Sequence, residues 1–178
     1  FIVISGDLVT DFAFQKIFDY HAEKQSKLTI TLTSVDNPLE FGVVIANENG
    51  RIEKFLEKPS WGEVFSDTIN TGIYVIEPEI LDYIPKNKNF DFAKDLFPLL
   101  MRKGIDLMAG HAQGYWRDVG NPESYRDVYE DILSGKIKFE LGGEAIKYPD
   151  GVLIHEGDFD IDESVEIVGI VVIGNDVA

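Results

Sequence analysis

Two aspartates stand directly after short apolar runs, where a carboxylate could hold a metal ion. Asp7 follows FIVISG, and Asp118 stands between Trp116 and Gly120 in YWRDVG. Open α/β sheets bind ligands in the crevice at the carboxyl ends of their strands. Mg²⁺ takes one or two carboxylates there and completes its shell with phosphate oxygens and water. The pair therefore indicates a candidate Mg²⁺ site, although either residue alone could instead serve a helix cap or a turn.

A second group of residues could recognise a sugar phosphate. Lys58 is a compact charge suited to phosphate, and Glu57 beside it is an acceptor suited to sugar hydroxyls. Consecutive strand residues point to opposite faces, so both can face one ligand only if the strand bends at Pro59. An exposed ion pair is the alternative interpretation. Gly42 and Asn70 interrupt apolar strands, which indicates a β-bulge or close approach of a ligand to the backbone.

The elements that would position these residues alternate between strands and helices. Apolar and alternating patterns predict strands over 1–5, 28–35, 68–76, 105–112 and 114–120, and a hairpin around Asn49-Gly50. Helices are predicted over 10–25, capped by Thr10 or Asp11, and over 78–83, 90–104 and 122–135. His21 completes an apolar helical stripe and is interpreted as a packed histidine. The pattern is that of an α/β domain with a mixed sheet.

The first strand indicates a sheet that begins upstream. A continuous apolar run over 1–5 is typical of a central parallel strand with neighbours on both sides. We therefore expect the sheet to be incomplete at its N-terminus and the chain to be a piece of a longer protein. An unpaired strand edge invites pairing with another chain, so we also expect self-association.

The last part of the chain has a period of six residues. Aliphatic residues recur at Ile161, Ile167 and Ile173, and at Val165, Val171 and Val177. This period predicts the start of a parallel β-helix over 152–178, after a linker over 136–151. Three six-residue rungs make one turn of such a helix. An ordinary pair of valine-rich strands is the alternative.

Charge and composition exclude several classes of partner. The net charge is −16, from 16 basic and 32 acidic residues, whereas nucleic acids and anionic membranes require a basic face. No apolar stretch approaches the roughly 18 residues of a membrane span. The absence of cysteine excludes thiolate metal sites, and the three histidines show no metal spacing. We expect neither nucleic acid nor a membrane as partner.

Four stretches of the sequence, taken together and in their order along the chain, resemble the sugar-1-phosphate nucleotidyltransferases, also called NDP-sugar pyrophosphorylases. They are FIVISGDLVTD, FGVV with IEKFLEKPSW, INTGIYVIEPEILDYI and GYWRDVGNPESYRDV, and the resemblance covers residues 1–135. It implies a Rossmann-like, GT-A-like mixed sheet followed by a left-handed β-helix. Within the family, the segment from Glu57 to Pro85 looks most like mannose-1-phosphate guanylyltransferases.

The resemblance implies a role for each residue. Asp7 and Asp118 would hold the catalytic Mg²⁺, and Lys58 would pair with the sugar phosphate. The sugar ring would be held by Glu57, Asn70, Thr71 and the Gly42 backbone, while Trp116 and Gly120 would support Asp118. The implied substrates are a nucleoside triphosphate and a sugar 1-phosphate, in a cytoplasmic homo-oligomer.

Departures from the family's pattern leave alternatives open. The glycine-rich loop that cradles the triphosphate, the residues that read the base and a second basic residue of the phosphate site are missing, so we expect this chain alone to be inactive. Glucose-1-phosphate enzymes that use UTP, dTTP or ATP are the runner-up. Two alternative functions belong to other classes of protein. One is a regulatory homologue that only binds sugar nucleotides, and the other is a β-helix acyltransferase.

Overall fold

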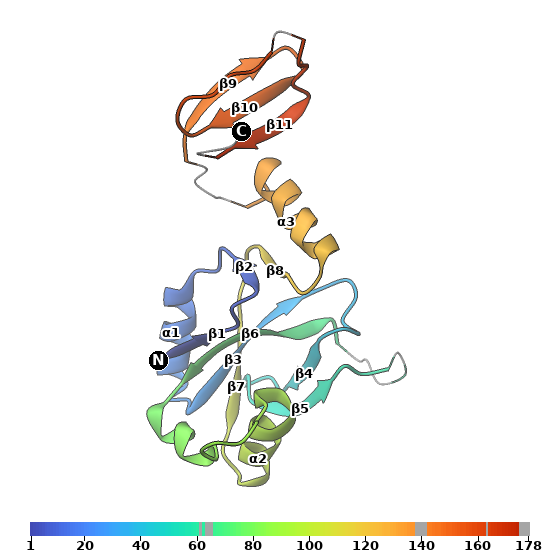
Figure 1. The fold of residues 1–178 in the computed structure, drawn as a ribbon. Coiled ribbons are helices and arrows are strands. Elements are labelled where there is room, and N and C mark those ends of the chain that lie inside the picture. The colour runs from blue at the N-terminus through green and yellow to red at the C-terminus, as the bar shows by residue number, and fades with distance from the viewer. Residues whose placement is uncertain (61, 63–65, 138–141, 163, 175–178) are drawn as a thin grey trace. The chain divides into compact units, whose positions relative to one another are not determined.

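The chain folds as two compact units, Phe1–Tyr125 and Arg126–Ala178 (Figure 1). The computed structural model describes residues 1–60, 62, 66–137, 142–162 and 164–174. None of the helices in this described part has the length and apolar character of a membrane span.

Strands and short helices alternate along the first unit, and α3 crosses the boundary between the units. In chain order the elements are β1 (Ile2–Ile4), β2 (Leu8–Thr10), α1 (Phe14–Glu23), β3 (Leu28–Ser34), β4 (Gly42–Ala46), β5 (Ile52–Glu57), β6 (Thr68–Ile76), the 3₁₀ helix η2 (Pro78–Tyr83), the π-helical turn η3 (Phe92–Leu96), α2 (Phe97–Arg102), β7 (Leu107–His111), β8 (Trp116–Asp118) and α3 (Pro122–Leu133).

The predicted mixed α/β sheet is confirmed. In the described residues the strand order is β5-β4-β6-β3-β7, and β1 pairs with β6 beside this path. β3 and β7 are parallel, whereas β6 runs antiparallel to β1, β3 and β4. β2 and β8 form a separate antiparallel ribbon in which Leu8 lies opposite Asp118.

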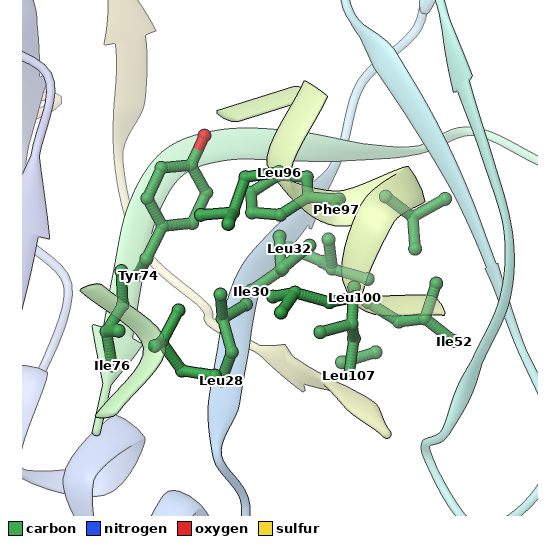
Figure 2. Packing of buried hydrophobic residues seen from close by; sticks show 13 residues of the cluster. Leu28, Ile30, Leu32, Ile52, Tyr74, Ile76, Leu96, Phe97, Leu100 and Leu107 are labelled. Atoms are coloured by element: carbon green, nitrogen blue, oxygen red, sulfur yellow. The ribbon is translucent and has the colours of Figure 1, made fainter. Parts of the chain in front are cut away.

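Side chains of β3 alternate between two covered faces of the sheet. Leu28, Ile30 and Leu32 belong to the main apolar cluster, to which η3 and α2 contribute Leu96, Phe97 and Leu100 (Figure 2). Thr29 points to the other face, where its hydroxyl lies 2.8 Å from Nδ1 of the buried His21 on α1. The sheet therefore carries helices on both faces, and His21 is the packed histidine that the helical stripe predicts.

The β4–β5 hairpin leaves the sheet and returns to it. Its base pairs with β6 at Val43 and Ile69. At its tip, the Gly50 carbonyl accepts a hydrogen bond of 2.7 Å from the Ala109 amide of β7. An ion pair of 2.9 Å between Arg51 and Asp106 lies next to this bond. The Asn49-Gly50 turn is thus confirmed, and the hairpin is held at both ends.

Two local predictions are wrong. β1 is antiparallel to its partner β6, because an apolar run carries no information about the direction of the neighbour. β1 is only half-buried, and in the described residues it pairs with β6 alone. Thr10 and Asp11 do not cap α1, which begins at Phe14. They bond to Tyr115 instead: the Thr10 hydroxyl donates to the Tyr115 carbonyl at 2.8 Å and an Asp11 oxygen accepts from the Tyr115 amide at 2.6 Å.

The second unit contains a small sheet of three strands in its described residues. β9 (Glu144–Tyr148) is antiparallel to β10 (Gly151–His155), and β10 is parallel to β11 (Gly169–Ile173). Gly151 lies opposite Gly169, an offset of 169 − 151 = 18 residues, which equals three six-residue rungs. Val177 of the period lies outside the described residues, and the β-helix stays a prediction. β9 falls within the predicted linker, 136–151.

Candidate active site

The β2–β8 ribbon brings the two predicted metal ligands together. Asp7 directly precedes β2, and Asp118 is the last residue of β8. The Val119 amide donates to the Asp7 carbonyl at 2.8 Å, which joins the backbones beside both carboxylates. Residues separated by most of the first unit therefore meet at one end of the ribbon.

Burial and neighbouring charges perturb the carboxyl of Asp118. Partial burial raises the pKa of its carboxyl, the Asp7 carboxylate raises this pKa further, and the Lys58 ammonium lowers it. Its Oδ1 atom is buried and has no hydrogen-bond partner among the described residues. A carboxylate that is desolvated, repelled by its neighbour and partly unpartnered fits a site for a cation.

Lys58 reaches the same site through a bend of the backbone. Its φ angle is +47°, in the left-handed region that residues other than glycine rarely adopt. The Lys58 amide donates to the Phe41 carbonyl at 3.2 Å, directly after β5 ends at Glu57. The predicted bend is thus present, one residue before Pro59. It breaks the strand alternation that would send the side chains of Glu57 and Lys58 to opposite faces.

Glu57 and Asn70 come together around Tyr74. The Asn70 amide nitrogen donates to the Tyr74 hydroxyl at 3.0 Å, and its oxygen accepts from the Gly72 amide at 3.1 Å. Burial raises the pKa of Tyr74 to about 12, and the Glu57 carboxylate contributes to this rise. The Tyr74 ring packs against Phe97 of the main apolar cluster (Figure 2), so the core holds this polar group in place.

Gly42 lies opposite Glu57 in the β4–β5 ladder, where a larger residue would force neighbouring side chains to shift. A Cβ atom there would lie 2.7 Å from Cζ of Phe55 and 2.9 Å from Oε2 of Glu57. We expect Gly42→Ala to displace Glu57 and to cost about 1–3 kcal/mol of unfolding free energy through overpacking. Urea unfolding measures this cost. The control is Gly62→Ala, because a Cβ at Gly62 meets no described atom within 4 Å; equal stability of the two variants would contradict the prediction.

The remaining predicted residues differ in accessibility. Thr71 is buried and its hydroxyl donates to the Thr31 carbonyl at 2.8 Å. A sugar contact by its side chain stays a prediction. Trp116 donates from Nε1 to the Thr71 carbonyl at 3.0 Å and packs edge-on against Phe41. A Cβ at Gly120 would lie 3.6 Å from both Asp118 carboxylate oxygens, in ordinary van der Waals contact with them.

A cleft of about 820 Å³ opens beside Asp7 and Asp118, and its volume is within the range of small-molecule sites. Lys58, Trp116, Asp118 and Gly120 line it, while Asp7, Gly42, Glu57, Asn70 and Thr71 are outside its lining. Sequence reasoning missed the other lining residues, which come from the end of β3, the β3–β4 loop, β8 and the region around the start of α3. They are Ser34, Val35, Asp36, Leu39, Glu40, Phe41, Arg117, Asn121 and Ser124. The turn signal Asp36-Asn37-Pro38 marks that loop but not its position beside the cleft.

Comparison with known proteins places this arrangement in a family. The model of the family described as nucleotidyl transferase matches residues 1–135. The chain is 38% identical over 140 residues to the UTP–glucose-1-phosphate uridylyltransferase of Synechocystis sp., covering 78% of the chain and 36% of that protein. It is 32% identical over 170 residues to the mannose-1-phosphate guanyltransferase of Debaryomyces hansenii, covering 93% of the chain and 44% of that protein.

Solved structures share the fold. A putative glucose-1-phosphate thymidylyltransferase from Bacillus anthracis, solved in complex with sucrose, superposes with a TM-score of 0.62 at 25% identity. The match covers 79% of this chain and 56% of that one. The chain spans 36% of the length of the Synechocystis sp. protein and 44% of the length of the Debaryomyces hansenii protein.

Proposed function

The chain belongs to the nucleotidyl transferase family, and on this premise we propose that it takes part in nucleotidyl transfer from GTP to mannose 1-phosphate, giving GDP-mannose and pyrophosphate. The observation that supports this reaction is the meeting of Asp7, Asp118 and Lys58 beside an open cleft. Two carboxylates and one ammonium can hold a cation and a phosphate together, which phosphoryl-group chemistry requires.

Each residue then has a role that its position permits. The phosphate of the sugar 1-phosphate attacks the α-phosphorus of the triphosphate in line, and pyrophosphate leaves. Lys58 holds the attacking phosphate, while Glu57, Asn70 and the Gly42 backbone orient the sugar. Asp7 and Asp118 would hold Mg²⁺, whose charge would neutralise phosphate oxygens. The protein's own contribution is positioning and charge, without a covalent intermediate.

The choice of mannose and GTP rests on similarity. The guanyltransferase of Debaryomyces hansenii covers 93% of the chain, and the segment from Glu57 to Pro85 resembles such enzymes. The uridylyltransferase of Synechocystis sp. has the higher identity, 38%. A glucose-1-phosphate enzyme that uses UTP is therefore the second candidate. The two sugars differ at one hydroxyl, so discrimination between them depends on few contacts.

Other classes fit the site less well. A subunit that only binds sugar nucleotides gains nothing from two repelling carboxylates with an unpartnered oxygen. A β-helix acyltransferase needs a catalytic histidine among its rungs, whereas His155 precedes the six-residue period that begins at Ile161. The β-helix, the homo-oligomer and the cytoplasmic location stay predictions.

Titration calorimetry of this chain tests the proposal. We expect mannose 1-phosphate and GDP-mannose to bind more tightly with Mg²⁺ than without it, and Asp7→Ala to remove this dependence. Glucose 1-phosphate is the control ligand, and tighter binding of glucose 1-phosphate than of mannose 1-phosphate would favour the second candidate. Binding that is equal with and without Mg²⁺ would contradict the metal role of Asp7.

A further inference from the structure

The β2–β8 ribbon that carries both aspartates is small. Each of its strands has three residues, and it lies outside the sheet of β3–β7. A two-stranded ribbon of this length is not stable by itself in water. Contacts with the main sheet must therefore fix the ribbon, and with it the distance between the carboxylates of Asp7 and Asp118.

A β-bulge in β6 supplies such contacts. The register of β3 against β6 shifts between Ile30 and Leu32, opposite the segment of β6 that contains Thr71 and Gly72. Gly72 has a φ angle of +76°, and its amide donates to the Asn70 side-chain oxygen at 3.1 Å. A bulge with glycine in the left-handed region turns carbonyl groups away from the regular ladder.

The carbonyls of Thr71 and Gly72 each accept a hydrogen bond from a residue near one of the two aspartates. The Gly72 carbonyl accepts from the Ser5 amide at 3.0 Å, in the turn that leads to Asp7. The Thr71 carbonyl accepts from Trp116 Nε1 at 3.0 Å, on the strand that ends at Asp118. Thr71 is itself fixed, because its buried hydroxyl donates to the Thr31 carbonyl of β3. One bulge thus connects both carboxylates to the centre of the sheet.

We propose that the Thr71–Gly72 bulge sets the separation of the two carboxylates, with Gly72 and Trp116 as positioning residues for the metal site. This inference rests on the proposed function, since it assigns a role toward the ion that Asp7 and Asp118 would hold. Neither positioning residue needs to touch the ion. Residues that orient metal ligands typically cost about 10–100-fold in metal affinity when they are changed.

Two substitutions separate this role from general stability. Trp116→Phe removes the Nε1 donor and keeps an aromatic ring against Phe41. Gly72→Ala places a Cβ 2.8 Å from the Ser5 hydroxyl oxygen and 3.3 Å from a Leu8 methyl, in a conformation unsuited to alanine. The matched control is Gly104→Ala: its φ angle is +74°, and a Cβ there meets no described atom within 4 Å. The control introduces the same backbone strain away from the ribbon.

The experiment measures Mn²⁺ affinity of the whole chain by electron paramagnetic resonance, at a temperature at which every variant is folded by circular dichroism. We expect Trp116→Phe and Gly72→Ala to weaken Mn²⁺ binding about tenfold, and Gly104→Ala to bind as the unchanged chain does. In ¹⁵N spectra, the Trp116 indole N–H, identified by its loss in Trp116→Phe, is expected to lose protection from hydrogen exchange in Gly72→Ala alone.

The outcomes distinguish the inference from the function on which it rests. Unchanged Mn²⁺ affinity in both site variants would overturn the positioning role and leave the metal site standing. No Mn²⁺ binding by the unchanged chain would overturn the metal site and the inference together. If Gly72→Ala does not fold, Trp116→Phe decides the question, because it removes one hydrogen bond and adds no atoms to the bulge.

Discussion

Asp118→Asn is expected to stabilise the metal-free chain at neutral pH and to remove the stabilisation that Mg²⁺ gives. The pKa of Asp118 is raised in the folded chain by burial and by Asp7. Ionised Asp118 therefore opposes folding, and asparagine removes that cost while keeping the shape. The carboxyl is only partly buried, and solvent screens the repulsion by Asp7, so we expect a gain of no more than about 1 kcal/mol. Thermal unfolding with and without Mg²⁺ measures both effects.

The sign of the pH dependence follows from the raised pKa. Between the ordinary and the raised pKa of Asp118, the folded chain binds more protons than the unfolded chain, so its stability increases as the pH falls through this window. The advantage of Asp118→Asn should be complete at neutral pH and should disappear at a pH below the window.

Saturation with Mg²⁺ should reverse the order of stability. A ligand at 100 times its Kd adds about 2.7 kcal/mol to the folded state that binds it, and we expect only the unchanged chain to gain this. Asp82→Asn, at an exposed position on η2, serves as the control and should show neither effect. If Asp118→Asn were less stable than the unchanged chain without metal, the assignment of Asp118 as a repelled carboxylate would be wrong.

Changes at Lys58 are expected to cause a large loss of affinity for mannose 1-phosphate. Lys58→Gln removes the charge, and Lys58→Gly removes both the charge and the strain of a φ angle of +47°. A hydrogen bond to a charged group contributes about 1.5–3 kcal/mol, so each variant should bind mannose 1-phosphate at least about tenfold more weakly. Titration calorimetry with mannose 1-phosphate measures this loss.

The stability of the two Lys58 variants tests the backbone strain separately. Both lack the charge that partly offsets the repulsion at Asp118, so this effect cancels between them. We expect the glycine variant to unfold at higher urea, by up to about 1 kcal/mol, because relief of the left-handed conformation exceeds the entropy that glycine adds to the unfolded chain. Gln25→Gly, at a φ angle of +48° two residues after α1 ends at Glu23, is the control: it should relieve strain without weakening the binding of mannose 1-phosphate. Equal binding in all three variants would remove Lys58 from the phosphate site.

Much of the fold was predictable because local chemistry agrees with it. Asn49-Gly50 forms the predicted hairpin turn, and the helical run predicted over 90–104 contains η3 and α2, with Pro98 in the first turn of α2. His21 was placed correctly by its helical spacing. The direction of β1 was not predictable, because direction depends on the neighbouring strand and not on the run itself. Thr10 and Asp11 have the chemistry of caps, but a distant partner, Tyr115, takes their hydrogen bonds.

The site was predictable in its residue types and less so in its connections. The rule that ligands lie beyond the carboxyl ends of strands led to Asp7 and Asp118, which the structure does bring together. Glu57 and Lys58 can face one ligand only if the strand bends beside Pro59, and the structure has this bend at Lys58. The bonds from Trp116 and Ser5 to the bulge have no local signature, because a tryptophan or a backbone amide in the sequence says nothing about which carbonyl it will meet.

The double attachment of the β4–β5 hairpin has a mechanical consequence. A hairpin fixed only at its base would behave as a cantilever, and bending of its strands would move the side chains that it carries. This hairpin resembles a beam with two supports, one at the pairing of Val43 with Ile69 and one at the bond from Ala109 to Gly50. Bending is then restrained at both ends. Gly42 and Glu57 lie beside the first support, so their separation is held before any ligand arrives.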